Sequence, residues 1–254
     1  MHPLTDPLLE ARGVIRRFGH VQALRGAAFT AYPGEVVALI GDNGAGKSTL
    51  VKTLSGALRP DAGEILLAGR RMRLTSPVDA QRLGIETVYQ DLALAHDLDA
   101  AANLFLGREL TRFPIVNLLD RGAMRRRATE AFDELGIRLP DMSAPVRQLS
   151  GGQRQCVAVA RAVAWASKVV FMDEPTAALG VLQRKQVLDL IRRVRDRGVT
   201  VVLISHNMPE VLAVADRVEV LRLGRRVARF AAADTSVEEL VSAMTGGLDQ
   251  EDAA

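Results

Sequence analysis

A glycine-rich loop that separates an apolar run from a segment of helical spacing constrains the fold of this chain more than any other feature. The loop is Gly41-Asp42-Asn43-Gly44-Ala45-Gly46-Lys47-Ser48. Residues 36–40 before it predict a buried strand, and residues 47–55 after it predict a helix that ends at Gly56. Strands and helices alternate again later in the chain. The sequence therefore predicts an α/β fold with helices beside a parallel sheet.

The remaining pattern predicts one domain over residues 1–246 and a flexible tail over 247–254. Apolar alternation at 8–18 and 23–32 predicts antiparallel strands. Helical spacing dominates 91–164, which predicts a helical subdomain inserted into the domain. Further strands are predicted at 63–67, 84–89, 169–172 and 199–204, with a strand pair within 218–228, and further helices at 153–164, 181–195, 210–215 and 237–244.

Composition and charge predict a globular protein in a reducing compartment. Of 254 residues, 48% are hydrophobic, and 33 Lys and Arg nearly balance 30 Asp and Glu, so the charge does not predict a nucleic-acid-coating tail. Residues 125–127, all arginine, fit the solvated side of an amphipathic helix better than a lipid or nucleic-acid patch. No window reaches the ~18 apolar residues of a membrane helix, and residues 1–13 lack the apolar run of a signal peptide. The single cysteine, Cys156, cannot form an intramolecular disulfide, and we expect a cytoplasmic chain.

The glycine-rich loop matches the phosphate-binding loop, or P-loop, of nucleotide-hydrolysing proteins, and we expect Gly41 to Thr49 to bind nucleotide. Its glycines let backbone N–H groups point at phosphate oxygens, and the positive end of the following helix adds to the attraction. Lys47 is expected to reach the β- and γ-phosphates, and the Ser48 hydroxyl to ligate Mg²⁺. An ordinary glycine-rich turn is the alternative, but such a turn does not need Lys47 and Ser48 in register.

Two carboxylates, Asp173 and Glu174, follow the apolar strand predicted at 169–172. If this strand ends beside the P-loop, Asp173 can hold Mg²⁺ and Glu174 can polarise the attacking water. An exposed acidic strand end is the alternative. Phosphoryl transfer needs positioning and charge neutralisation more than covalent help. A lysine, a metal ion and a water-orienting base therefore form a sufficient catalytic set.

A second glycine-rich segment, Leu149-Ser150-Gly151-Gly152-Gln153, opens the helix predicted at 153–164. Ser150 offers a hydroxyl, and the two glycines offer accessible N–H groups, so Ser150 to Gln153 form a candidate second phosphate site. A plain helix N-cap is the alternative. Leu149 and Asp173 are separated by 24 positions (173 − 149), which leaves room for one helix and a turn before the strand.

In this order the three motifs resemble those of the ATP-binding cassette (ABC) family. The resemblance implies a RecA-like mixed-sheet core with an antiparallel β subdomain and an inserted helical subdomain, and it implies hydrolysis of ATP with Mg²⁺. Gln90 resembles the glutamine that ligates Mg²⁺ and senses the γ-phosphate, and His206 resembles the switch histidine that contacts the γ-phosphate. Phe18 resembles the aromatic residue that stacks on adenine, although an apolar residue closing a strand is nearly as good an interpretation.

The chain departs from the family pattern at one position. The family commonly continues the segment Asp173-Glu174-Pro175-Thr176 with Ser-Ala-Leu-Asp, whereas residues 177–180 here are Ala-Ala-Leu-Gly. The missing carboxylate normally helps to couple two ATP sites across a dimer. Gly180 therefore puts that coupling in doubt and leaves hydrolysis plausible.

Three segments, 76–94, 103–109 and 204–225, resemble the ATPase subunits of bacterial monosaccharide importers of the ribose, xylose and fructose type. This resemblance implies a homodimer or paired cassette bound at the inner face of the cell membrane. It also implies integral membrane permease subunits and, indirectly, a periplasmic sugar-binding protein as partners. The alternatives are a cassette for another transported substrate and a non-transport cassette acting on nucleic acid or ribosomes. We expect no nucleic-acid partner, because the long coiled-coil insertion or second cassette of those classes is missing.

Overall fold

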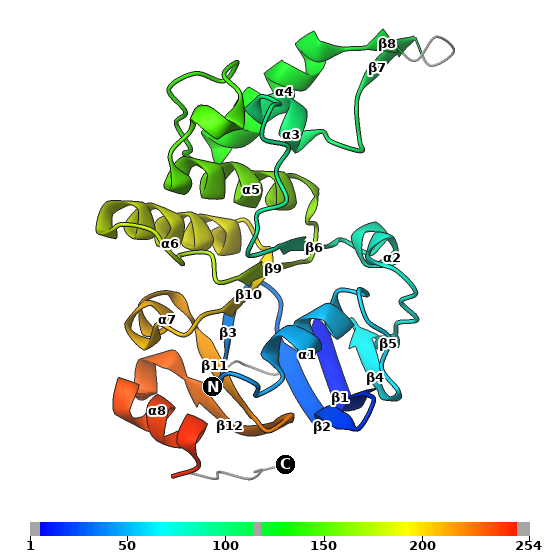
Figure 1. Cartoon of the computed structure of the whole chain (residues 1–254), viewed down its shortest axis with the longest axis vertical. Coiled ribbons are helices and arrows are strands. Elements are labelled where there is room, and N and C mark those ends of the chain that lie inside the picture. The colour runs from blue at the N-terminus through cyan, green and yellow to red at the C-terminus, as the bar shows by residue number, and fades with distance from the viewer. Residues whose placement is uncertain (1–5, 114–117, 248–254) are drawn as a thin grey trace.

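The computed structural model describes residues 6–113 and 118–247, which form a sheet-rich end and a helical end (Figure 1). A six-stranded central sheet has the order β12 (Arg225–Ala231), β11 (Arg217–Arg222), β3 (Val36–Ile40), β10 (Thr200–Ile204), β9 (Val169–Asp173), β6 (Ile85–Val88). A four-stranded sheet has the order β2 (Val21–Ala31), β1 (Leu9–Phe18), β4 (Ala62–Leu67), β5 (Arg70–Arg71). Both sheets lie at the same end of the molecule (Figure 1).

The central sheet is parallel except at β12, its antiparallel edge strand. Every residue of β3 and β10 is buried, as expected of strands that are covered on both faces. In the register of the sheet, Ile204 lies opposite both Leu39 and Asp173. The carboxyl ends of the five parallel strands consequently share one edge of the sheet. This mixed sheet confirms the predicted RecA-like core.

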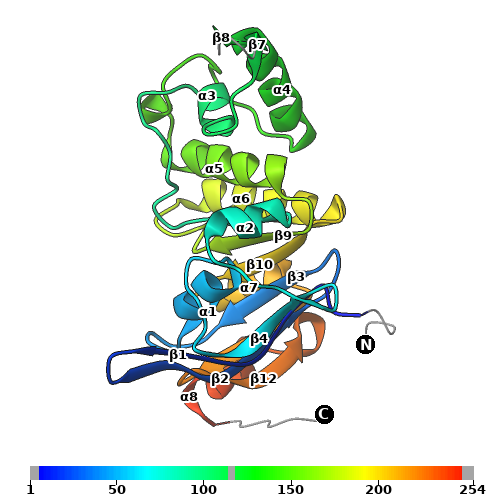
Figure 2. The same cartoon turned by 90° about the vertical axis from the view of Figure 1, so that its right-hand side faces the viewer.

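The smaller sheet is antiparallel throughout and packs on helix α1 (Lys47–Leu54), as Figure 2 shows. Leu50 and Leu54 of α1 join one hydrophobic cluster with Phe29 of β2, Ile65 of β4 and Phe171 of β9. The helix that follows the P-loop is thus clamped between the two sheets. A loop with helices and strands packed on both sides is a rigid place for a binding site.

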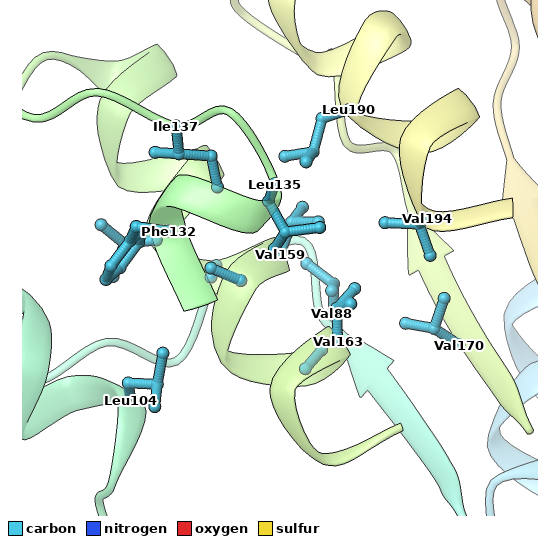
Figure 3. Packing of buried hydrophobic residues seen from close by; sticks show 14 of the residues in the cluster. Val88, Leu104, Phe132, Leu135, Ile137, Val159, Val163, Val170, Leu190 and Val194 are labelled. Atoms are coloured by element: carbon cyan, nitrogen blue, oxygen red, sulfur yellow. The ribbon is translucent and has the colours of Figure 1, made fainter. Parts of the chain in front are cut away.

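The helical end shares its core with the central sheet. Phe132 of α4 (Arg121–Glu134) and Leu135, the residue after α4, share a buried cluster with Val159 of α5 (Gly151–Trp165), and Figure 3 shows Leu135 beside Val159. The same cluster continues to Leu190 of α6 (Val181–Asp196) and to Val170 of the sheet. Helix α5, which begins at the second glycine-rich segment, is therefore packed between the helical end and the sheet.

The predicted strands and helices are confirmed, with bounds that differ by a few residues. Three features were not predicted from the sequence: the strand β5, the helix α2 (Pro77–Arg82) and a hairpin of β7 (Thr111–Phe113) and β8 (Leu118–Leu119) inside the segment predicted to be helical. The remaining elements are α3 (Ala100–Leu104), η1 (Val146–Gln148), α7 (Met208–Val214), η2 (Ala232–Asp234) and α8 (Val237–Thr245). The division at 91–164 stays a prediction. The tail predicted at 247–254 lies, apart from Gly247, outside the described residues.

Over residues 6–113 and 118–247, no helix has both the length and the apolar character needed to cross a membrane. The exposed side chains of residues 125–127 lie on α4, as predicted for a solvated helix face.

The thiol of Cys156 is expected to react slowly with alkylating reagents. Burial raises its pKa to about 11, because burial disfavours the thiolate. At pH 7.5 the folded chain should therefore react with iodoacetamide at least about 100-fold more slowly than the unfolded chain, where the thiol has an ordinary pKa near 8.5. Mass-spectrometric labelling with and without guanidinium measures both rates. Equal rates would contradict the burial of the thiol.

Candidate functional site

The P-loop lies at the carboxyl end of β3 and depends on glycine at two positions. Gly41 has φ 151° and Gly46 has φ 104°, both in the region that favours glycine. A β-carbon at Gly41 would lie 2.1 Å from the carbonyl oxygen of Leu221, and one at Gly46 would lie 2.7 Å from that of Ala23. The loop is therefore pressed against β11 and β2, and only glycine fits both contacts.

The side chain of Lys47 curls back over the loop. Its Nζ donates to the carbonyl oxygens of Gly41, at 2.6 Å, and of Asp42, at 3.0 Å. Burial lowers the pKa of Lys47, whereas the charges of Glu174, Asp42 and Asp173 oppose that shift. Gly46 caps α1 without a side-chain hydrogen bond. The first N–H groups of α1 are thus available to an anion, beside a lysine that already points into the loop.

Asp173 and Glu174 lie at the same edge of the sheet. Asp173 is the last residue of β9, and its pKa is raised by burial and by the neighbouring charge of Glu174, against the charges of Lys47 and Lys52. Glu174 adopts φ 51°, a conformation uncommon for a residue with a side chain, and its N–H donates to the carbonyl oxygen of Ile204 at 2.9 Å. The end of β9 is thus fastened to the end of β10.

His206 contacts Glu174 directly. Nδ1 of His206 lies 2.8 Å from Oε2 of Glu174. The Glu174 side chain is 17% exposed and that of His206 is 74% exposed, so the pair has one sheltered member and one that faces solvent. The structure brings together the carboxylate and the imidazole that the sequence placed at separate strand ends.

Gln90 lies two residues beyond β6, at the edge where β9 also ends. Val88 of β6 is opposite Met172 of β9 in parallel register, and the Gln90 side chain is exposed. Ligand sites of open parallel sheets lie outside the carboxyl ends of the strands. Gln90, Lys47 and His206 all follow strands that end at this edge, and Asp173 is the last residue of one such strand.

Phe18 ends β1 with 45% of its surface exposed. The guanidinium carbon of Arg16 lies 5.0 Å from the centre of its ring. Phe18 is opposite Val21, at the start of the strand that contacts Gly46 through Ala23. An exposed aromatic ring therefore lies on the strand pair that borders the P-loop, and one of its faces is covered by a cation.

Ser150 to Gln153 form the amino end of α5 as a capping box. The Ser150 hydroxyl accepts from the Gln153 N–H at 3.3 Å, and Oε1 of Gln153 accepts from the Ser150 N–H at 2.9 Å. Among the described residues, no hydrogen bond or ion pair joins this segment to the P-loop. The helix-cap alternative is thus correct for the single chain, and phosphate binding by the same residues stays a prediction.

The segment after Glu174 packs on this second glycine-rich motif. A β-carbon at Gly152 would lie 2.6 Å from Cγ of Gln183, and one at Gly180 would lie 2.6 Å from Oε1 of the same side chain. Gly180 itself has φ −70° and ψ 168°, which any residue can adopt, and it caps α6 without a side-chain hydrogen bond. The backbone conformation at position 180 therefore does not require glycine.

Thr176 and Glu210, which were not predicted from the sequence, join the segments that carry Glu174 and His206. The Thr176 hydroxyl donates to Oε2 of Glu210 at 2.5 Å, and Nδ2 of Asn207 donates to Oε1 of Glu210 at 3.0 Å. The spacing of Asn207 and Glu210, with Pro209 between them, is a signal for a helix amino end. That signal predicts α7 but does not reveal the contact with Thr176.

The fold and the loop together define a P-loop nucleotide-binding protein. The model of the ABC transporter family matches residues 24–177, and the chain belongs to this family. A member of the family hydrolyses ATP, so the protein is an ATPase.

Several curated proteins are similar over nearly the whole chain. The fructose import ATP-binding protein FrcA of Rhizobium meliloti is 52% identical to this chain, and the match covers 96% of each of the two chains. The xylose/arabinose import ATP-binding protein XylG of Sulfolobus acidocaldarius is 47% identical, with 94% of both chains covered. The ribose import ATP-binding protein RbsA 1 of Rubrobacter xylanophilus is 49% identical, and this chain spans 47% of its length.

Solved structures agree on the fold. The protein cbiO1 from Clostridium perfringens, described as part of the ABC transporter complex cbiONQ, superposes with a TM-score of 0.77 at 27% identity and 93% coverage of both chains. A nucleotide-free ATP-binding cassette superposes with a TM-score of 0.77 at 24% identity, covering 94% of this chain and 96% of the other.

Proposed function

We propose that this chain is the ATP-hydrolysing subunit of a bacterial importer for a monosaccharide. The similarity to a fructose import subunit, 52% identical over 96% of both chains, carries the proposal. Two further relatives are named for the import of xylose or arabinose and of ribose. Their shared substrate class is a monosaccharide. The P-loop and the carboxylates at the strand ends support the proposal.

In this proposal Gly41 to Thr49 bind the phosphates of ATP through backbone N–H groups. Nζ of Lys47 leaves the carbonyl oxygens of the loop and binds the β- and γ-phosphates instead. Glu174 orients the attacking water and accepts its proton. His206, in contact with Glu174, faces the γ-phosphate, and Gln90 senses it from the end of β6. The exposed ring of Phe18 stacks on adenine.

The residues at this edge fit a magnesium ion held jointly with the nucleotide. Within the described ranges no cluster of three or more His, Cys, Asp or Glu side chains could hold a metal ion. Oxygen donors suit Mg²⁺, and we propose that the Ser48 hydroxyl, the Gln90 side chain and Asp173 provide them. Burial and the charge of Glu174 raise the pKa of Asp173. A cation bound beside Asp173 would lower that pKa again, because it would favour the ionised carboxylate. A bound Mg²⁺ would neutralise charge on the phosphates.

Two chains are needed for a complete site in this proposal. Ser150 to Gln153 present N–H groups at the amino end of a 15-residue helix, yet they contact no part of their own P-loop within the described residues. A second copy, or a paired cassette, would present them to the ATP of the first. Each of the two ATP molecules would then lie between the P-loop of one chain and Ser150 to Gln153 of the other.

The proposed transporter contains further subunits. An importer needs integral membrane permease subunits, and a periplasmic sugar-binding protein would deliver the sugar to them. The ATPase would bind the permease at the cytoplasmic face of the membrane. Because the ATPase does not touch the sugar, the choice among monosaccharides belongs to the permease and the binding protein.

Deletion of the gene is expected to abolish the uptake of one monosaccharide. The deletion strain and its parent are compared for uptake of radiolabelled fructose, xylose, arabinose and ribose, and a plasmid copy of the chain should restore the lost uptake. A plasmid copy with Lys47→Ala should not restore it and serves as the matched control. Unchanged uptake of every sugar in the panel would refute the proposal.

A further inference from the structure

Glu210 lies near the amino end of α7 with a carboxylate that accepts hydrogen bonds on both oxygens. Oε2 accepts from the Thr176 hydroxyl at 2.5 Å, and Oε1 accepts from Nδ2 of Asn207 at 3.0 Å and from Nη1 of Arg184 at 3.4 Å. The side chain is only 11% exposed. A sheltered carboxylate with three side-chain donors holds those donors in place, because each loses its partner if the carboxylate is removed.

Two of the three donors come from the segments that carry the Glu174–His206 pair. Thr176 is two residues after Glu174, and Asn207 directly follows His206. Arg184 comes from α6, which begins after the segment that contains Thr176. A single carboxylate therefore bridges the chain after Glu174 to the chain after His206.

The backbone of the first segment is strained and needs such support. Glu174 has φ 51° and Ala178 has φ 57°, and Thr176 lies between these two left-handed residues. Glu174 N–H donates to the Ile204 carbonyl at 2.9 Å, and within the segment Ala177 N–H donates to the Glu174 carbonyl at 3.1 Å and Leu179 N–H to that of Thr176 at 3.3 Å. Residues held in sparsely populated conformations persist only where surrounding contacts hold them. The bond from Thr176 to Glu210 is one of those contacts.

We propose that Glu210 is a positioning residue for ATP hydrolysis, which acts by holding Glu174 and His206 in contact. The inference rests on the proposed roles of Glu174 and His206. Within the described ranges no hydrogen bond or ion pair joins Glu210 to either residue, and its effect passes through Thr176 and Asn207. It should therefore affect the catalytic step more than the binding of ATP, which belongs to the P-loop.

Removal of the carboxylate is expected to lower kcat and leave KM for ATP nearly unchanged. Small displacements of a catalytic group can cost up to about 100-fold in rate, and we expect Glu210→Ala to lose about 10- to 100-fold in kcat with less than a twofold change in KM. Thr176→Val should show the same pattern, and Thr176→Ser, which keeps the hydroxyl, should retain the parent rate. Steady-state phosphate release by the purified full chain measures all three.

Glu239 provides a matched control. It occupies the same third position of a helix, α8, and accepts from the Thr235 hydroxyl at 2.9 Å and the Ser236 N–H at 2.9 Å. Glu239→Ala removes a comparable carboxylate away from the strand ends and should leave kcat unchanged. If Glu210→Ala and Thr176→Val lower kcat no more than Glu239→Ala does, the inference is wrong.

A double variant separates positioning from general destabilisation. If Glu210 acts through Glu174, then Glu174→Gln combined with Glu210→Ala should hydrolyse ATP no more slowly than Glu174→Gln alone. A further loss of 10-fold in the double variant would overturn the inference. A parent chain without any ATPase activity would instead refute the proposed function. The two failures are therefore distinguishable.

Discussion

Glu174→Gln should bind ATP like the parent chain and hydrolyse it about 100- to 10,000-fold more slowly, the range expected when a general base is lost. The amide keeps the size of the side chain and can still contact His206, but it cannot accept a proton from the attacking water. In the proposed two-site assembly, ATP that is bound but not cleaved should also hold two chains together. Phosphate release measures the rate of hydrolysis, and titration with a fluorescent nucleotide measures the affinity for ATP. Light scattering in the presence of ATP measures the mass of the assembly.

Glu238→Gln is the control for this change. It removes the same charge from an exposed position of α8 and should leave phosphate release unaltered. A Glu174→Gln chain that releases phosphate at the parent rate would exclude Glu174 as the base. A chain that no longer binds ATP would show that the substitution acts on the P-loop, through the charge that Glu174 contributes near Lys47.

Mixing two inactive variants should restore activity if each site takes residues from two chains. Lys47→Ala removes the lysine of the P-loop, and Gly151→Asp places a carboxylate where the second motif would meet a phosphate. Each variant alone should lose most of its activity. In a mixed dimer one site contains the intact P-loop of one chain and the intact Ser150 to Gln153 of the other. Random pairing of equal amounts should return up to about one quarter of the parent activity.

Gly151→Asp suits this test because the single chain should tolerate it. A β-carbon at Gly151 would lie 3.6 Å from Cδ2 of Leu179, an ordinary contact, and an acidic residue in the first turn of a helix is favourable. The control mixes Lys47→Ala with the double variant Lys47→Ala/Gly151→Asp, in which no pairing creates an intact site. Recovery in that control, or none in the test mixture, would argue against sites shared between chains.

The parts of the site that could be predicted from the sequence are those that depend only on the succession of strands, loops and helices along the chain. A strand, a glycine-rich loop and a helix in succession place Lys47 at the end of β3, and a second apolar strand places Asp173 and Glu174 at the same edge. Parallel pairing then aligns these ends without knowledge of any long-range side-chain contact. Because β9 pairs with β10, Glu174 and His206 lie just beyond neighbouring strand ends, where Oε2 of Glu174 and Nδ1 of His206 are 2.8 Å apart.

The parts that were missed depend on side chains meeting across the fold. Thr176 and Glu210 are 34 positions apart, and neither residue type is unusual where it stands. Helix α2 was missed because its signal is short, although Ser76 and Asp79 form a capping box with Pro77 in the first turn. The hairpin of β7 and β8 interrupts a segment whose apolar spacing is helical on both sides. Short elements give little periodicity to detect.

The side chain of Gln183 occupies the space beside both Gly152 and Gly180. An aspartate at position 180, as in the common family pattern, would have to push Gln183 aside, and Gln183 rests directly on the second glycine-rich motif. A side chain at position 180 therefore requires a displaced or smaller side chain at position 183. In the proposed assembly of two chains, a change at position 180 would therefore reach the motif that serves the neighbouring ATP through the side chain of Gln183.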